Sequence, residues 1–464
     1  MTLFQRSLFL VPFCSVSFLC PAFGQEAVLP IDDVKLFAEI FGGIKNYYVD
    51  DVSDKKLIEN AIKGMVSGLD PHSSFLDAKA YKDLQESTTG EFGGLGIEVT
   101  KDPQGIRVVS PIDDTPAARA GVLAGDIIIK IDGKVSADRS LDENVKLMRG
   151  EPGTPITLTI ARKGTVKPVV LHLVRAVIKI HSVKFKALEN HIGYIRISQF
   201  QGKTTKDTAE ALIKLHKDSA LKGIVLDLRN NPGGLLNAAV GVSAAFLKKD
   251  VPVVSTKGRE KTSERIFKTT VHDYTVTNDD NDELHGVPAA AKTIPLVVLV
   301  NSASASASEI VSGALQDHKR AVVMGTRTFG KGSVQTIIPL RVKSGETLGL
   351  KMTTARYYTP SGRSIQAQGI YPDIAVDDTP EGNYPSFVIR EADLSGHIEA
   401  ENTKKKNETE ILEDDSNSEA PVPKLRYAFG DKNDFPLQQA VNYLLGKPVI
   451  THKQTATKSA AKKK

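Results

Sequence analysis

Cysteine is almost absent from this chain of 464 residues. Its two cysteines, Cys14 and Cys20, both lie within the first 24 residues. Without those residues no thiol remains, which excludes disulfide bonds and cysteine chemistry from the rest of the chain. An excess of charge is also missing, because the formal net charge is +5 and much of it lies in the final stretch KQTATKSAAKKK. This balance gives no indication of a nucleic-acid partner.

The N-terminal hydrophobic run is short. Arg6 precedes the apolar stretch SLFLVPFCSVSFLC, which contains Pro12 and falls below the roughly 20 residues of a membrane span. Ala22-Phe23-Gly24 follows, a small-x-small sequence of the kind that signal peptidase cleaves. Neither cysteine follows the small residues that a lipid-attachment site needs. We therefore expect residues 1–24 to be a signal peptide and the mature chain to be exported.

A helical region is expected at residues 25–90. Between Leu57 and Leu69, apolar residues recur at three- and four-residue spacing, which gives one apolar stripe on a helix. The sequence LDPHSSF at 69–75 then ends the helix with a turn. We expect His72 in this turn to be a structural hydrogen-bonding residue rather than a ligand or a base.

A glycine-rich loop in GEFGGLGIEV, residues 90–99, comes directly before a short apolar strand. Strand GIRVVS, a short helix, the turns GD and DGK, a second helix LDENVKLMRG and strand PITLTIAR follow. This order resembles a β-rich PDZ domain with two helices, which we place at residues 91–178. The resemblance implies that a bound peptide adds a strand here, its terminal carboxylate held by the N–H groups of Leu95, Gly96 and Ile97.

The pattern becomes α/β after residue 179. KGIVLDL and IPLVVLV are short apolar runs, typical of buried strands in a parallel sheet. The first leads into RNNPGGLL and then into an Ala- and Val-rich helix near residues 236–247. Residues 257–293 carry little apolar periodicity, so we expect a surface excursion there. We place this α/β core at residues 179–395.

Four serines alternate with alanines in NSASASASEI, residues 301–310. The run lies between the strand IPLVVLV and the helical EIVSGALQD, the layout of a strand-to-helix turn at the carboxyl end of a sheet strand, where active sites are common. A structural interpretation competes, because Ser306 and Glu309 fit the capping box S-x-x-E. On this segment alone a helix cap is the favoured interpretation, and a role of one serine as a nucleophile stays open.

A serine nucleophile needs a base to take its proton. His318 is nearest in sequence, but it falls about 18 Å away along the same helix. Lys331 lies between Gly330 and Gly332, which permit a close approach of backbone to a ligand. As a base it must be neutral, and burial in an apolar site lowers a lysine pKa. Gln335 could orient the amine by hydrogen bonding if a turn brings the two side chains together. The competing interpretation of Lys331 is a surface lysine in a glycine turn.

Six motifs in one order resemble the carboxyl-terminal processing proteases, serine peptidases that use a Ser/Lys dyad. They extend over about residues 35–395 and read LDPHSSFL, FGGLGIEV, DLRNNPGGLL, NSASASASEIVSGALQD, TFGKGSVQ and TTARYYTPSGRSIQAQGIYPDIAV. The resemblance implies Ser306 as the nucleophile, Lys331 as the base and Gln335 as its orienting partner. Their spacing of 25 and 4 residues is similar to the family's. The sequence departs from the family at Ser302 and Ala303, where glycines are common.

The implied fold is a multi-domain α/β chain with an N-terminal helical region, a PDZ domain and a crotonase-like protease core. The implied reaction is acyl transfer, in which an acyl-enzyme forms and water hydrolyses it. Its developing negative charge needs fixed donors, and the candidates are the N–H groups of Ala307 and of Gly233 or Gly234. An ordinary turn is the alternative interpretation of NPGG. No cofactor and no metal are expected.

The C-terminal part changes composition. Residues 396–424 mix both charges with few apolar groups, so we expect a disordered linker. Residues 425–464 hold the amphipathic sequence FPLQQAVNYLLG, which is expected to dock on the core or to serve a partner, and a basic tail.

The resemblance implies protein substrates with apolar C-termini. It leaves open a lipoprotein adaptor, an inner-membrane association and a homo-oligomer, and together with the signal peptide it indicates the periplasm. Two functions compete with proteolysis. A non-catalytic PDZ adaptor on a crotonase-like core would need the dyad to be absent or misplaced, and small-molecule acyl chemistry does not explain a PDZ domain.

Overall fold

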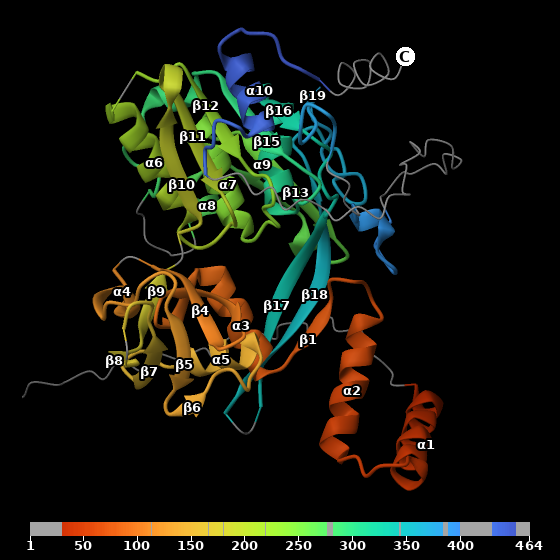
Figure 1. The fold of residues 1–464 in the computed structure, drawn as a ribbon. Coiled ribbons are helices and arrows are strands. Elements are labelled where there is room, and N and C mark those ends of the chain that lie inside the picture. The colour runs from red at the N-terminus through yellow and green to blue at the C-terminus, as the bar shows by residue number, and fades with distance from the viewer. Residues whose placement is uncertain are drawn as a thin grey trace, which may run out of the picture. The chain divides into compact units, whose positions relative to one another are not determined.

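The computed structural model describes residues 30–112, 114–165, 167–179, 181–218, 220–275, 282–342, 345–383, 388–399 and 429–451 (Figure 1). The chain divides into two compact units, residues 1–62 and 63–464. The expected signal peptide at 1–24, nearly all of the expected linker and the basic tail lie outside the described residues. No helix in the described ranges is long and apolar enough to cross a membrane.

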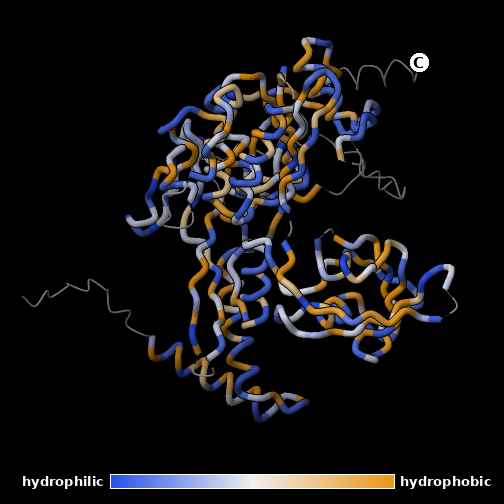
Figure 2. Tube along the Cα trace, turned by 90° about the vertical axis from the view of Figure 1, so that its left-hand side faces the viewer, coloured by the Kyte–Doolittle hydropathy of each residue, from blue (hydrophilic) through white to orange (hydrophobic). Residues whose placement is uncertain are grey.

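The first unit holds α1 (Ile31–Tyr47) and the beginning of α2 (Asp54–Ser67), as the helical pattern predicts. The end of α1 is tied to the start of α2, because Lys45 Nζ lies 3.1 Å from Asp54 Oδ1. Hydrophobic residues recur along these helices (Figure 2). Many of those on α1 are exposed: Ile31, Val34, Leu36, Phe37, Ile40 and Ile44.

The second unit begins with the rest of α2, the short strand β1 (Ser74–Leu76) and α3 (Ala78–Thr89). Helix α3 starts at Asp77, whose side chain accepts a hydrogen bond from the Ala80 N–H, and ends at Gly90 in the left-handed conformation. Strand β2 (Glu91–Gly94) then pairs with β9 (Ala176–Lys179), so the two ends of the next domain lie side by side.

That domain, which resembles a PDZ domain, is an antiparallel sheet in the order β3-β4-β5-β7-β8 with β6 beside β5. Strand β3 is at an edge of this sheet. Helices α4 and α5 complete the domain around a separate apolar core. The elements are β3 (Ile97–Asp102), β4 (Gly105–Pro111), α4 (Pro116–Arg119), β5 (Ile127–Ile131), β6 (Lys134–Val135), α5 (Leu141–Met148), β7 (Pro155–Ala161) and β8 (Val169–Val174).

The core contains a six-stranded sheet in the order β10-β11-β12-β15-β16-β19. Strand β10 is antiparallel to β11, and the remaining neighbours are parallel. The strands are β10 (Val183–Leu188), β11 (Ile192–Ile197), β12 (Gly223–Asp227), β15 (Leu296–Val300), β16 (Val322–Gly325) and β19 (Ile374–Ala375). The predicted buried strands are β12 and β15, and every residue in both is buried.

Both faces of this sheet are covered, which explains why β15 is apolar throughout and why β12 carries no polar side chain before its last residue, Asp227. On one face, Ile224 and Leu226 pack with α6 (Thr204–Asp218), α7 (Leu236–Phe246) and α9 (Ala307–Asp317). On the other face, Val225 packs with α10 (Phe435–Leu444), which lies beside β12, β15 and β16 (Figure 1). The amphipathic C-terminal sequence therefore docks on the core, one of its two expected roles.

A second sheet has the order β1-β18-β13-β14, with β17 on β18. It comprises β13 (Pro252–Gly258), β14 (Arg265–Lys268), β17 (Ser333–Arg341) and β18 (Thr347–Tyr358). Residues 257–293, expected to be a surface excursion, are mostly exposed or half-buried in their described part, but they contain regular structure. Strand β14 pairs with β13, α8 (Val271–Tyr274) follows, and Tyr274 and Ala291 are buried in the main core.

Candidate active site

Ser306 lies at the carboxyl end of β15, immediately before α9, in the predicted strand-to-helix turn. It is the N-cap residue of α9, as the capping-box pattern predicts, and its backbone has φ 53° and ψ −111°. Residues other than glycine rarely adopt this conformation, and such strain concentrates at functional positions. The turn therefore holds Ser306 in a backbone geometry that an ordinary helix cap does not need.

Glu309 lies in the first turn of α9 and is completely buried. Its Oε2 accepts hydrogen bonds from the backbone N–H of Ser306 at 2.8 Å and of Lys331 at 2.9 Å. Its Oε1 accepts from the Gly330 N–H at 2.7 Å and from the Thr328 hydroxyl at 2.5 Å. The capping-box pattern predicts only a capping role for Glu309, but the carboxylate also accepts from the backbone of the glycine turn around the candidate base.

Burial raises the pKa of Glu309 to about 7, although its hydrogen bonds act in the opposite direction. A carboxylate can accept from all four donors, whereas a protonated carboxyl has one oxygen that must itself donate. The complete set of hydrogen bonds therefore belongs to the ionised form.

Lys331 is largely withdrawn from solvent. Burial lowers the pKa of its amine, and the charge of Lys351 lowers it further, while Glu391, Glu309 and Asp70 act in the opposite direction. In the described part of the chain, Lys331 Nζ donates no hydrogen bond to another group. An amine with a lowered pKa and no acceptor is suited to take a proton at moderate pH.

Gln335 lies in β17 next to a bulge in the pairing with β18. Its side-chain nitrogen donates to the Ser333 hydroxyl at 2.9 Å and, more weakly, to the Thr353 hydroxyl at 3.4 Å. Among the described residues, no hydrogen bond joins Gln335 to Lys331. Gln335 therefore lies on the strand that follows the candidate base, but the structure does not connect the two side chains directly.

Asp70, from a distant part of the sequence, contacts β18, the strand that pairs with β17. Its carboxylate accepts from the hydroxyls of Ser73 at 2.6 Å and of Thr353 at 3.1 Å. Burial acts to raise its pKa, but the Ser73 hydroxyl and other donors keep the pKa below its ordinary value. Sequence reasoning missed Asp70, although it stands in the LDPHSSF motif and its partner Thr353 also contacts Gln335.

His72 makes the second connection from that motif. Its Nε2 lies 2.8 Å from Oε2 of the buried Glu391, which also accepts from Gln366 Nε2 at 2.8 Å. The Gln366 side-chain oxygen in turn accepts from the Gly332 N–H at 2.9 Å, next to Lys331. The prediction of a structural hydrogen-bonding role for His72 is confirmed. No group of three or more His, Cys, Asp or Glu residues in the described ranges could hold a metal ion.

The candidate oxyanion donors lie around Ser306. A Cβ atom added to Gly233 would lie 2.8 Å from Ser306 Cβ and 3.0 Å from the Ala307 nitrogen. The N–H of Gly233 already donates to Asn231 Oδ1 at 2.9 Å. Within the described residues, the N–H groups of Gly234 and Ala307 donate to no other protein group. Of the two glycines, Gly234 therefore has its N–H available.

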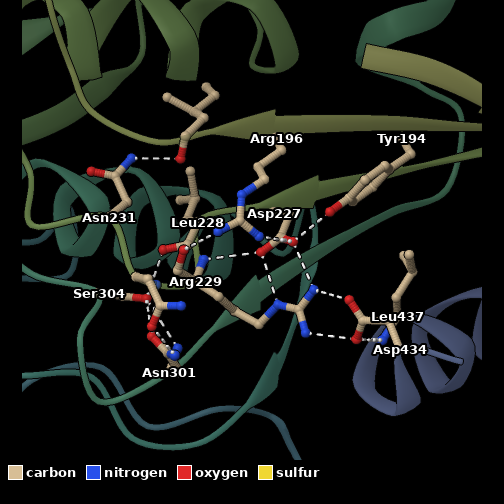
Figure 3. Close-up of polar contacts among 12 residues, drawn as sticks. Tyr194, Arg196, Asp227, Leu228, Arg229, Asn231, Asn301, Ser304, Asp434 and Leu437 are labelled. Atoms are coloured by element: carbon tan, nitrogen blue, oxygen red, sulfur yellow. Dashed lines mark hydrogen bonds and ion pairs between the residues drawn. The ribbon is translucent and has the colours of Figure 1, made fainter. Parts of the chain in front are cut away.

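Two of the other serines of the run, Ser304 and Ser308, join this turn to residues 228–231, and Figure 3 shows Ser304 beside Leu228. The buried hydroxyl of Ser304 donates to the Leu228 carbonyl at 2.8 Å, and that of Ser308 donates to the Asn231 carbonyl at 2.9 Å. The same Asn231 carbonyl accepts from the Ala305 N–H at 3.0 Å. These contacts fix the nucleophile turn against the segment that carries the candidate oxyanion glycines.

In the domain that resembles a PDZ domain, Leu95 and Gly96 form the link between β2 and β3. Gly96 has φ +76°, and an added Cβ atom would lie 2.4 Å from the Thr115 side chain, so glycine is required here. The N–H groups of Leu95 and Gly96 donate to no other group of the described chain. Ile97 begins edge strand β3, where a peptide strand could pair.

Comparisons with known proteins agree with this architecture. Residues 191–376 match the model of peptidase family S41, and residues 93–173 match the PDZ domain. Residues 24–80 match the N-terminal domain of the activating protease CtpB. These matches define the class of protein as a peptidase core combined with a PDZ domain.

Relatives extend the match to most of the chain. A carboxy-terminal-processing protease of Bartonella bacilliformis is 48% identical over 421 residues, which cover 90% of this chain and 88% of the relative. A probable CtpA-like serine protease of Staphylococcus haemolyticus is 38% identical, covering 80% and 70%. The structure of a photosystem II D1 C-terminal processing protease is 31% identical, with a TM-score of 0.40 and coverage of 74% and 92%.

The chain belongs to peptidase family S41, as a C-terminal processing serine protease with a PDZ domain. The fold class expected from the sequence and the expectation of a serine-type peptidase are confirmed by the family matches and the 48% identical relative. A non-catalytic adaptor and small-molecule acyl chemistry are therefore set aside.

Proposed function

We propose that this chain is an exported serine endopeptidase that cleaves proteins near apolar C-termini, with Ser306 as the nucleophile and Lys331 as the general base. The observation that carries this proposal is the shared carboxylate of Glu309. Because Oε2 accepts from the N–H of both residues, their backbone nitrogens lie no further apart than two hydrogen-bond lengths. Residues far apart in the sequence are held within reach of one reaction centre.

The neutral amine of Lys331 takes the hydroxyl proton as Ser306 Oγ attacks the peptide carbonyl carbon. The carbonyl oxygen becomes negatively charged, and the free N–H groups of Ala307 and Gly234 are suited to stabilise it, Gly233 giving the space for the close approach. Collapse releases the amine product, which takes the proton from Lys331, and leaves an acyl-enzyme. Water, deprotonated by the same amine, hydrolyses the ester and restores Ser306.

The PDZ domain supplies a site for the substrate's end. The free N–H groups of Leu95 and Gly96, together with edge strand β3 and its first residue Ile97, suit a peptide that ends in a carboxylate and pairs as an added strand. Apolar side chains lie along this strand and on α5, including Val99, Leu141 and Val145, so the tail that fits is apolar.

The proposed periplasmic location rests on residues 1–24 and on the family. The exposed apolar side chains of α1 support the proposed homo-oligomer, because apolar stripes of this kind usually pack against another surface. A lipoprotein adaptor and an inner-membrane association remain proposals that rest on the family resemblance alone.

Variants of the dyad test the proposed mechanism. The substrate is a reporter protein ending in alanine, valine and leucine, compared with the same reporter ending in two aspartates. Ser306→Ala and Lys331→Ala should each abolish cleavage, whereas Ser302→Ala should cleave at the normal rate. Near-normal proteolysis by either dyad variant would contradict the assignment, and equal rates on the two reporters would contradict recognition of apolar tails.

A further inference from the structure

Arg229 lies between β12 and the glycines of the NPGG sequence, in a segment we call the 229–234 loop. Its guanidinium is placed between two carboxylates, Asp227 at the end of β12 and Asp434 at the start of α10 (Figure 3). Nη1 and Nη2 donate to the two oxygens of Asp434 at 2.8 and 2.7 Å. Nε and Nη2 donate to Asp227 at 2.9 and 2.7 Å. The arginine thus makes bidentate contacts on both sides.

This cluster is buried. The side chain of Arg229 is 12% exposed, that of Asp434 6% and that of Asp227 0%. Burial by itself would lower the pKa of Arg229, but the two carboxylates hold it well above its ordinary value. A buried charge that loses one partner is left poorly compensated. The ion pair between Arg229 and Asp434 therefore constrains both the 229–234 loop and α10.

On one side, the cluster continues to the nucleophile turn. Leu228 and Asn231, next to Arg229, offer the carbonyls that accept from Ser304 and Ser308. The loop then reaches Gly233, where an added Cβ atom would lie 2.8 Å from Ser306 Cβ. A change in the position of Arg229 therefore acts on the candidate oxyanion donors through a few hydrogen-bonded residues.

On the other side, the cluster continues to the C-terminal segment, residues 429–451. Asp434 caps α10 by accepting from the Leu437 N–H at 3.2 Å. Phe435 and Leu437 are buried against the sheet face that α6, α7 and α9 do not cover. Five residues before Asp434, the Phe429 carbonyl accepts a hydrogen bond from Lys186 Nζ at 3.2 Å, which is a second anchor of the same segment.

We propose that Asp434 acts through Arg229 to position the 229–234 loop for transition-state stabilisation. The C-terminal segment would then contribute to catalysis as well as to the fold. Asp434 and Arg229 are then positioning residues that touch no substrate atom. Oxyanion donors act on the transition state more than on the bound substrate, so a loosened loop lowers kcat and leaves KM almost unchanged. This inference rests on the proposed oxyanion donors of the protease.

The test compares two single substitutions in the full chain. Asp434→Asn keeps the size of the side chain but removes the charge that faces Arg229. Lys186→Met removes the hydrogen bond to the Phe429 carbonyl in the same segment and leaves both carboxylates that face Arg229 in place. Steady-state kinetics on the apolar-tailed reporter are combined with thermal unfolding and with the rate of labelling by a fluorophosphonate, whose phosphorus bonds to the serine oxygen as fluoride leaves.

Asp434→Asn should lower kcat about tenfold, a fraction of the 10²–10³ lost when one oxyanion donor is removed outright. KM should change by less than about twofold, and fluorophosphonate labelling should slow in parallel with kcat. Asp434→Glu keeps the carboxylate and should have a kcat closer to that of wild type. Lys186→Met should retain kcat within about twofold. Equal kinetics for wild type and Asp434→Asn, or equal losses in Asp434→Asn and Lys186→Met, would overturn the proposal. Activity in Ser306→Ala would instead overturn the proposed mechanism.

Discussion

The backbone N–H groups of Ser306 and Lys331 donate to one and the same oxygen, Oε2 of Glu309, at 2.8 and 2.9 Å. The candidate nucleophile and the candidate base are therefore held together through their backbones rather than through their side chains. This leaves the hydroxyl and the amine free to react. It also makes the ionisation of Glu309 a condition for the geometry of both residues.

Glu309→Gln should lower kcat about 100-fold, the loss expected when reacting groups are misplaced by around 1 Å. The amide offers one acceptor oxygen and one donor nitrogen, so two of the four N–H and O–H groups that face Glu309 lose their acceptor. Asp317→Asn is a matched control, since it makes the same change at the other end of α9, where the carboxylate accepts from Ser361. Similar kcat values in the two variants would contradict a positioning role for Glu309.

The pH dependence of stability gives a second measurement on Glu309. Its folded pKa of about 7 lies above the ordinary 4.5, so the folded protein binds this proton more tightly than the unfolded chain. The free energy of unfolding should therefore fall by about 3 kcal/mol as pH rises from 4.5 to 7, and level off above that. Urea unfolding at several pH values should show no such decrease for Glu309→Gln. The same pH dependence in wild type and Glu309→Gln would mean that Glu309 is not the source of the decrease.

Lys351→Met should move the acid limb of the pH–rate profile to higher pH. Burial and the charge of Lys351 both lower the pKa of Lys331, so removing that charge raises this pKa and reduces the neutral fraction of the base. The rate should fall near pH 7 and stay normal at alkaline pH, where Lys331 is neutral in both proteins. Lys351→Arg keeps the charge and should leave the limb in place. A limb that does not move in Lys351→Met would exclude this electrostatic effect.

The strands and helices of the core were predictable because their signals are local. The apolar runs of β12 and β15 and the stripe on α2 follow from period and composition. The turn at Ser306 was predictable because a buried strand, small residues and a helix follow one another directly. The strand within 257–293 was not predicted because β14 is four residues long, none of its residues is buried, and it is defined by its pairing with β13.

The supporting side chains of the site could not be predicted in the same way. Asp70 meets Thr353 across 283 residues, and Arg229 meets Asp434 across 205. Such pairs depend on how separate elements pack, which no local period encodes. Gln335 shows the same limit, since its expected contact with Lys331 is replaced by hydroxyl groups of its own strand and of β18.

The serine run separates into residues with different expected effects on stability. Ser304→Ala and Ser308→Ala each remove a buried hydroxyl that donates to a carbonyl of residues 228–231, although each carbonyl keeps a backbone N–H donor. Each should lower the free energy of unfolding by about 1 kcal/mol. The Ser302 hydroxyl donates to no group in the described chain, so Ser302→Ala should stay within about 0.5 kcal/mol of wild type. Urea unfolding of the three variants measures the difference, and a uniform effect would contradict it.

Gly233→Ala should abolish most activity, while Gly362→Ala should not. Both glycines have a positive φ, +101° and +83°, so both substitutions add backbone strain of about 1–2 kcal/mol. Around Gly362 an added Cβ atom meets nothing within 4 Å. At Gly233 it would lie 2.8 Å from the Ala305 carbonyl oxygen and from Ser306 Cβ, so the nucleophile turn or the 229–234 loop must move. The expected fall in kcat for Gly233→Ala is about 100-fold or more. If both variants lose stability alike but keep equal kcat, Gly233 serves only as a turn and the oxyanion assignment beside Ser306 is wrong.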